Sequence, residues 1–168
     1  MKILILTGPA GVGKNTIARI LATKRERCAV IDADAVRWML LQPHKAPWSG
    51  EEGRRQQILG VKNACLLAHN FVQNNSDVVI LDVLSKETLD IYKKELSKLN
   101  PKIILLLPTF EEIQRRNKTR PLHITEEEIA MLYKSQEVLQ NYDEKIDNSN
   151  LSAEEAADKL NAGLNYEN

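Results

Sequence analysis

The 168-residue sequence has few cysteines, no net charge and no long apolar run, and each absence excludes a class of protein. Cys28 and Cys65 are too few and too far apart for a disulfide framework or a zinc ribbon, and the three histidines show no metal-ligand spacing. Lys plus Arg equals Asp plus Glu at 23 each, so no global charge attracts nucleic acid or an anionic membrane. No run approaches the roughly 18 apolar residues of a membrane span, and we expect a cytoplasmic protein that binds neither membrane nor nucleic acid.

Short apolar runs alternate with stretches of helical periodicity. The apolar runs, which predict buried strands, lie at residues 2–6, 28–32, 77–82 and 102–108, with a weaker strand at 145–147. Periodicity predicts helices over residues 35–41, 58–72, 89–99 and 152–160. Three further helices are predicted to begin at residue 14, Thr109 and Thr125. This alternation predicts an α/β fold, a three-layer, doubly wound parallel sheet in a single domain over residues 1–168. Ligands of such sheets bind beyond the carboxyl ends of the strands.

The segment GPAGVGKNT, residues 8–16, has the spacing of a phosphate-binding loop between the first strand and the first helix. Its glycines let the backbone N–H groups point inward at phosphate oxygens, and the helix N-terminus adds partial positive charge. Lys14 would reach the β- and γ-phosphates and take part in catalysis. The predicted nucleotide contacts are Gly8, Pro9, Ala10, Gly11, Val12, Gly13, Lys14, Asn15 and Thr16.

The loop departs from the usual pattern at Asn15, where Ser or Thr normally gives magnesium a hydroxyl oxygen. The asparagine amide oxygen is also a ligand that hard cations accept. Because this side chain is longer by one atom, it could bind the metal directly only with adjustment, or through a water. Thr16 cannot substitute, since the next helical residue points about 100° away.

Carboxylates follow the second and third predicted strands. Phosphoryl transfer needs a carboxylate that orients the acceptor hydroxyl and takes its proton, and acidic groups near magnesium. We predict Asp34 as the base, with Asn15, Asp32 and Asp82 at the metal, although Asp32 or Asp34 could instead cap the next helix. Asp82 ends VVILD, a Walker B pattern. Arg37, one helical turn beyond Asp34, could receive a polar or anionic substrate, or be an exposed arginine with no role.

Four cations lie shortly before a proline: Arg115, Arg116, Lys118 and Arg120. Glu111 and Glu112 stand four residues before the first two arginines, so a solvated, salt-bridged helix face is one interpretation. Two pairs cannot neutralise four cations, and γ-phosphoryl transfer calls for cations that close over the phosphate. We therefore predict a lid at about 115–128, with Arg116 and Arg120 catalytic and Arg116 also at the nucleotide.

With these pieces in this order, the chain resembles the small P-loop kinases over essentially its whole length. This group includes shikimate, gluconate and adenylylsulfate kinases, chloramphenicol phosphotransferase and polynucleotide kinase domains. IDADAVR (31–37) is similar to the D-G-D-N-x-R run of adenylylsulfate kinases, RxxxRPL (116–122) to the shikimate kinase lid, and residues 147–160 to the segment that flanks adenine. The resemblance implies a P-loop nucleoside triphosphate hydrolase fold with a five-stranded parallel sheet in the order 2-3-1-4-5. It also implies ATP and Mg²⁺ as co-substrates.

The sequence indicates the type of reaction more clearly than the identity of the phosphate acceptor. No glycine triplet follows the third strand, so shikimate itself is not favoured, and residues 43–55 match none of these subfamilies. We expect an acceptor-binding segment at about 34–75, with Asp34, Arg37, Trp48 and Arg54 at the substrate, although Trp48 could equally serve packing. The resulting hypothesis is an ATP-dependent kinase of a small hydroxylated molecule, either monomer or dimer. A polynucleotide 5′-end kinase and a nucleotide-binding regulatory protein without transfer activity are the alternatives.

Overall fold

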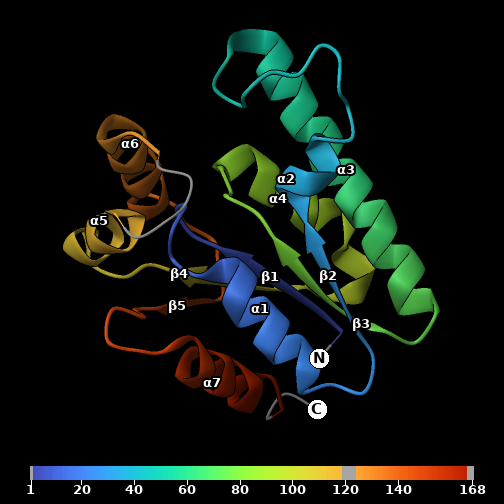
Figure 1. The fold of residues 1–168 in the computed structure, drawn as a ribbon. Helices are drawn as coiled ribbons and strands as arrows, with labels where there is room; N and C mark the ends of the chain where they lie inside the picture. The colour runs from blue at the N-terminus through green and yellow to red at the C-terminus, as the bar shows by residue number, and fades with distance from the viewer. Residues whose placement is uncertain (1, 119–123, 166–168) are drawn as a thin grey trace.

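A parallel sheet with helices on both faces dominates the computed structural model, which describes residues 2–118 and 124–165 (Figure 1). The strands stand in the order β2-β3-β1-β4-β5, as the resemblance implied. They span Ile3–Thr7 (β1), Cys28–Asp32 (β2), Asp77–Leu81 (β3), Lys102–Leu106 (β4) and Glu144–Ile146 (β5). The helices span Lys14–Thr23 (α1), Ala33–Arg37 (α2), Gly50–Gln73 (α3), Lys86–Glu95 (α4), the 3₁₀ turn Ser97–Leu99 (η1), Phe110–Lys118 (α5), Glu126–Glu137 (α6) and Ala153–Asn165 (α7).

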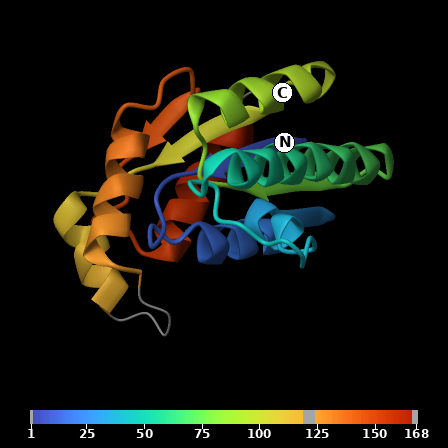
Figure 2. The same ribbon diagram turned by 90° about the horizontal axis from the view of Figure 1, so that it is seen from above.

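The sheet is buried on both faces because its central strands are apolar at nearly every position. In β1, Leu4 and Leu6 enter one core while Ile3 and Ile5 enter the other, as the alternation of side chains along a strand requires. Helices α1 and α7 cover the first face, and α3 and α4 cover the second (Figures 1 and 2). Parallel strands are joined by such crossover helices, so the predicted fold class is confirmed.

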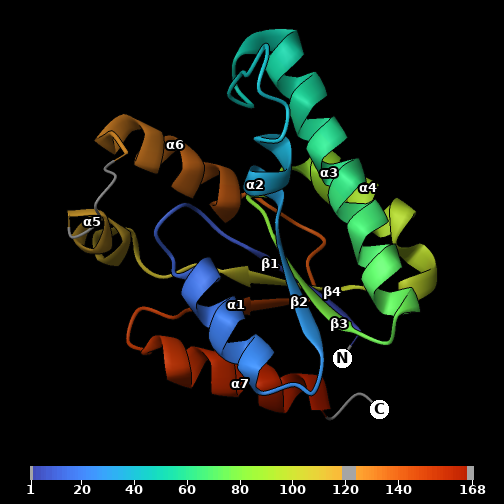
Figure 3. The ribbon, with the colours of Figure 1, turned by 45° about the vertical axis from the view of Figure 1, so that its right-hand side comes forward.

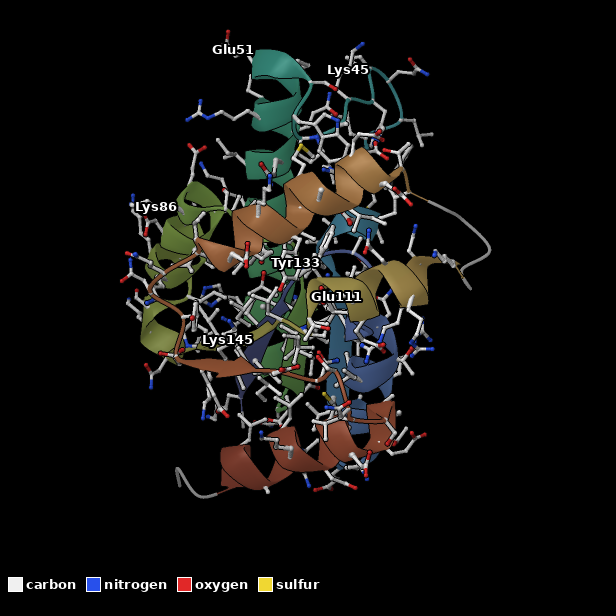
Figure 4. The ribbon with its side chains drawn as sticks, turned by 90° about the vertical axis from the view of Figure 1, so that its left-hand side faces the viewer. Lys45, Glu51, Lys86, Glu111, Tyr133 and Lys145 are labelled. Atoms are coloured by element: carbon white, nitrogen blue, oxygen red, sulfur yellow. The ribbon has the colours of Figure 1, made fainter. Side chains whose placement is uncertain are left out.

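The connections at the carboxyl ends of the strands carry the residues of interest. β1 leads through residues 8–13 into α1, β2 runs directly into α2, and β3 leads through residues 82–85 into α4. Helices α5 and α6 lie beyond the carboxyl end of β4, and the start of α3 lies away from them (Figure 3). Lys45 and Glu51 mark the far end of a projection formed by residues 38–49 and the start of α3 (Figure 4).

The helix expected at residues 35–41 is where the prediction is wrong. The carboxylate of Asp32 caps α2, which therefore begins at residue 33, and α2 ends at residue 37. Beyond it, the N–H groups of Met39 and Leu40 bond to carbonyls three residues back, and the Trp38 ring stacks on His44 with centroids 3.4 Å apart. These contacts turn the chain away from the helix axis. Among all the described helices, none is long and apolar enough to cross a membrane.

Candidate functional site

The loop at residues 8–13 curls from β1 into the N-terminus of α1. Gly8 has a φ of +144°, and a Cβ there would lie 2.2 Å from the carbonyl oxygen of Leu106, so only glycine fits. Gly13, at φ +95°, precedes α1, and no side chain caps this helix. The N-terminus of α1 therefore faces the loop without a side-chain cap, and the helix dipole there favours negative charge. The Nζ of Lys14 folds back over the loop and donates to the carbonyls of Gly8 at 2.6 Å and Pro9 at 3.1 Å.

A cavity of about 500 Å³ opens at this loop and gathers most of the predicted site. Its walls are formed by Ala10, Gly11, Gly13, Lys14, Asn15, Thr16, Asp32, Asp34, Leu81, Asp82, Val83 and Arg116. Residues from the phosphate loop, the ends of β2 and β3, and α5 thus meet in one space. Gly8, Pro9 and Val12 belong to the loop but do not line this cavity.

Asn15 is hydrogen-bonded to the first carboxylate of the site. Its Nδ2 donates to Oδ2 of Asp32 at 3.2 Å, and Oδ1 of Asp32 accepts from the N–H groups of Asp34 at 3.0 Å and Ala35 at 3.4 Å. The capping role considered for either aspartate therefore belongs to Asp32. Capping and contact with Asn15 coexist because a carboxylate has two oxygens that each accept more than one hydrogen bond.

Asp82 is the buried carboxylate of the site, with 8% of its surface exposed. Its Oδ1 accepts from the N–H of Val83 at 2.7 Å, and its Oδ2 accepts from the hydroxyl of Tyr92 at 3.0 Å. Burial, and next the charge of Asp34, raise the pKa of Asp82 to about 6, although both hydrogen bonds and Lys14 oppose the rise. Asp82 is therefore mainly ionised at neutral pH but takes up a proton in mild acid.

Asp34 and Arg37 form an ion pair on one face of α2, with an N–O distance of 3.0 Å. The Asp34 side chain is 60% exposed and lines the cavity, whereas that of Arg37 is only 11% exposed. Helix α3 packs closely here, because a Cβ at Gly60 would lie 3.2 Å from the Cβ of Arg37. The Nε atom of Arg37 is buried without a hydrogen-bond partner. The geometry thus presents Asp34 to the cavity and places Arg37 behind it.

Arg116 ties α5 to the phosphate loop. Its guanidinium donates to the carbonyl of Val12 at 3.3 Å and to that of Asn148 at 2.8 Å, while Nε donates to Glu112 at 2.6 Å. The side chain of Asn148 donates to the same Val12 carbonyl at 2.9 Å. Glu112 also binds Arg115 at 2.7 Å, so in the salt-bridged interpretation the pair of Arg116 with Glu112 is present, whereas Arg115 pairs with Glu112 and not with Glu111. Arg116 is a fixed wall of the cavity in this conformation.

The other predicted residues lie elsewhere. Trp48 is 54% exposed on the projection, and neither it nor Arg54 lines the cavity at the phosphate loop. Arg54 makes a bidentate ion pair with Glu87 of α4, in which Nε lies 2.8 Å from Oε2. Arg120 lies outside the described residues, as do residues 119–123 as a whole.

Sequence reasoning missed the residues that support the site through hydrogen bonds. Periodicity places Tyr92 in the core of α4 but cannot show that its hydroxyl reaches Asp82. The one available signal is that a tyrosine at a core position needs a polar partner. Asn148, 2% exposed, lies in the segment whose resemblance pointed to the adenine site, yet no motif marked its contact with the phosphate loop.

The donor set of the cavity suits magnesium bound together with a nucleotide. Carboxylate and amide oxygens of Asp32, Asp82 and Asn15 are the hard ligands that this ion prefers. Within residues 2–118 and 124–165, no cluster of three or more His, Cys, Asp or Glu side chains could hold a metal ion. Magnesium commonly takes only one or two protein carboxylates and fills its octahedron with water and phosphate oxygens, so the residues present fit that role.

Several solved structures share this fold. A sugar kinase from Janibacter sp. HTCC2649 has 16% identity and a TM-score of 0.75, with 98% of this chain and 95% of that chain covered. The tunicamycin resistance protein of Deinococcus radiodurans has 15% identity and a TM-score of 0.70, covering 98% and 96%. Shikimate kinase from Acinetobacter baumannii, in complex with shikimate, has 21% identity and a TM-score of 0.64, covering 99% and 95%. At these identities the likeness shows the fold alone.

Sequence comparison identifies the family. No curated protein matches the chain significantly. Residues 4–132, however, match the family model described as an AAA domain, which spans the phosphate loop, both carboxylate-bearing strand ends and α5. The chain therefore belongs to the AAA domain family and has the P-loop nucleoside triphosphate hydrolase fold shared by the small P-loop kinases.

Proposed function

We propose that this protein transfers the γ-phosphoryl group of ATP to a hydroxyl of a small molecule. The observation that carries the proposal is the single cavity in which Lys14 of the phosphate loop meets Asp34 of α2 and Asp82 at the end of β3. These are the groups that phosphoryl transfer requires: a cation at the phosphates, a carboxylate for the acceptor, and acidic groups for a metal ion. The sugar and shikimate kinases of the same fold support the assignment.

The phosphate loop binds the triphosphate in this proposal. The uncapped N–H groups at the start of α1 and the Lys14 ammonium group contact phosphate oxygens, and Lys14 gives up its bonds to the loop carbonyls to do so. Asn15, Asp32 and Asp82 would hold magnesium, directly or through water, and the ion would supply positive charge beside the phosphates. Arg116 adds positive charge at the edge of the nucleotide site.

Asp34 is the proposed base. It lines the cavity with most of its carboxylate exposed, whereas the two oxygens of Asp82 already accept hydrogen bonds from Val83 and Tyr92. Asp34 orients the acceptor O–H and takes its proton as the acceptor oxygen bonds to the γ-phosphorus and the bond to ADP breaks. The Arg37 guanidinium, 3.0 Å from Oδ1, holds the carboxylate in place.

The acceptor is proposed to bind to the segment at about 34–75, with its hydroxyl at Asp34. Within that segment the buried amide of Gln56 binds the carbonyl of Pro43 at 2.6 Å and the N–H of Lys45 at 2.9 Å. These bonds hold the turn that carries Trp48 against α3, so Trp48 is positioned to form an apolar wall. Arg54 is engaged by Glu87 and becomes available to a substrate only if that ion pair opens. The lid at about 115–128, with Arg120, is part of the same proposal.

The proposal is tested by measuring ADP release from Mg·ATP with a panel of acceptors. The panel contains sugars, shikimate, tunicamycin, nucleosides and an oligonucleotide with a free 5′-hydroxyl. Stimulation by one small molecule, with no response to the oligonucleotide, supports the assignment. Stimulation by the oligonucleotide alone, with steep loss in salt, identifies a polynucleotide kinase instead. Tight ATP binding with no stimulation by any acceptor identifies a regulatory protein.

A further inference from the structure

A closed ring of buried hydrogen bonds joins three elements behind the site. The hydroxyl of Thr7 donates to Oε1 of Gln136 at 2.9 Å and accepts from the N–H of Leu84 at 3.0 Å. Nε2 of Gln136 donates to the carbonyl of Leu84 at 2.7 Å, which closes the ring. Thr7 and Gln136 are both fully buried. None of the three residues lines the cavity.

The three residues of the ring come from segments that border the phosphate loop, the Asp82 turn and the end of α6. Thr7 is the last residue of β1 and precedes the first glycine of the phosphate loop, and Leu84 follows Asp82 by two residues. Gln136 lies in the last turn of α6, 129 residues from Thr7. One glutamine amide therefore connects α6 to the two strand ends that carry the phosphate loop and the buried carboxylate.

A second connection reaches the other end of the same loop. Arg116 of α5 donates to the carbonyl of Val12, so α5 holds the loop near its end while α6 holds it at its beginning. Helices α5 and α6 also contact each other, since the rings of Phe110 and Tyr133 lie 5.1 Å apart; Figure 4 shows Tyr133 between the two helices. The pair of helices is thus joined to both ends of the phosphate loop.

We propose that Gln136 is a positioning residue that sets the phosphate loop and the Asp82 turn relative to α6. An apolar side chain of similar size would fill the same space, but it would leave the Thr7 hydroxyl and the Leu84 carbonyl unsatisfied in the core. Hydrogen bonds depend on distance and direction, so the ring fixes the position of α6 more closely than non-directional apolar contacts would. Its consequence for ATP binding rests on the proposed function, whereas its mechanical role does not.

The test uses Gln136→Leu, with Gln56→Leu as the matched control. Gln56 is also buried, at 2% exposure, and like Gln136 it donates from its amide to one backbone carbonyl. Its amide oxygen accepts from the N–H of Lys45 in the projection, whereas that of Gln136 accepts from the Thr7 hydroxyl. Amide hydrogen exchange is measured without nucleotide at two reporters, relative to the amides of β4. One reporter is the N–H of Ile17, bonded to Gly13, and the other is the N–H of Asp82, bonded to Leu6. Thr7→Val, a nearly isosteric change, is a second variant should Gln136→Leu fail to fold, and Thr7→Ser retains the hydroxyl.

We expect faster exchange at both reporters in Gln136→Leu and Thr7→Val, and parental exchange in Gln56→Leu and Thr7→Ser. The dissociation constant for Mg·ATP should rise at least about fivefold in the first two variants, the lower end of coupling between sites. Parental exchange at both reporters in Gln136→Leu and Thr7→Val would overturn the positioning role. If the parent does not bind ATP, the proposed function fails, and the exchange result still decides the role of Gln136.

Discussion

The side chain of Asn15 donates from Nδ2 to Oδ2 of Asp32 at 3.2 Å, so the residue that departs from the phosphate-loop pattern contacts the site's first carboxylate. Because a carboxylate only accepts hydrogen bonds, the NH₂ group faces Asp32 and the amide oxygen is available to a cation. A Ser or Thr hydroxyl could perform both tasks with one atom, donating its hydrogen and offering its oxygen. Asparagine divides the two tasks between two atoms.

Substitution of Asn15 tests this division. In Asn15→Ser the hydroxyl can again donate to Asp32 and approach magnesium more closely. ATP binding should therefore require a lower magnesium concentration. Asn15→Leu removes both the donor and the amide oxygen, so ATP binding should require a higher magnesium concentration. Calorimetric titration of ATP at a series of magnesium concentrations measures the effect, with the exposed Asn70→Leu as control. If Asn15→Leu keeps the parental magnesium dependence, the metal is held by the carboxylates and water alone.

Lys14→Ala should abolish nucleotide binding with little loss of fold. The ammonium group contributes charge to the ligand, and its hydrogen bonds to the carbonyls of Gly8 and Pro9 are partly buried and lie within the loop. Calorimetry with Mg·ATP and a thermal unfolding curve check the two halves of the prediction, and Lys62→Ala on the exposed face of α3 is the control. Parental ATP affinity in Lys14→Ala would remove the phosphate-loop assignment.

Asp34→Asn should keep ATP affinity and lower turnover by about 10²- to 10⁴-fold, the usual worth of a positioned acid–base group. The amide preserves the shape of the side chain but cannot take the acceptor proton. Steady-state kinetics with an identified acceptor separates the two effects, and Asp90→Asn, which alters a surface ion pair on α4, controls for charge. Turnover at the parental rate in Asp34→Asn would show that another group is the base.

The buried Asp82 should leave a signature in the pH dependence of stability. Its pKa is raised from 3.8 to about 6 in the folded protein, so the folded state takes up a proton before the unfolded state as the pH falls. The metal-free parent should therefore gain stability relative to Asp82→Asn between pH 7 and pH 4, whereas above pH 7 the difference should be constant. Urea unfolding of both proteins across this range provides the measurement. A difference that is flat with pH would mean that Asp82 is not perturbed by burial.

Much of the fold could be predicted because the sheet follows from local pattern. Each central strand is a short apolar run buried on both faces, and such runs signal parallel strands without knowledge of their partners. The end of α2 could not be predicted, because the stacking of Trp38 on His44 is a tertiary contact that overrides helical periodicity. The meeting of the phosphate loop, Asp34 and Asp82 in one cavity could be predicted, because the loop and Asp82 directly follow strand ends and Asp34 lies two residues beyond one.

The supporting contacts could not be predicted because they join residues far apart in sequence. The Arg116 contact with Asn148 spans 32 positions, and the contact of Asn148 with Val12 spans 136. The charge pattern and the resemblance of residues 116–122 to the shikimate kinase lid marked Arg116 as a lid residue, and only the structure shows its guanidinium bound to backbone carbonyls. Likewise the sequence predicts Arg54 at the substrate, whereas in the structure the ion pair with Glu87, 33 residues away, sets the orientation of its side chain.

Direct identification of a phosphorylated product tests the central claim most directly. The acceptor that stimulates ADP release is incubated with Mg·ATP carrying a labelled γ-phosphate, and the products are analysed by mass spectrometry and ³¹P NMR. The account predicts a phosphate ester on one acceptor hydroxyl that carries the label, formed by the parent protein, strongly slowed in Asp34→Asn and absent in Lys14→Ala. Release of labelled inorganic phosphate with no ester on any acceptor, at the same rate in the parent and in Asp34→Asn, would contradict it.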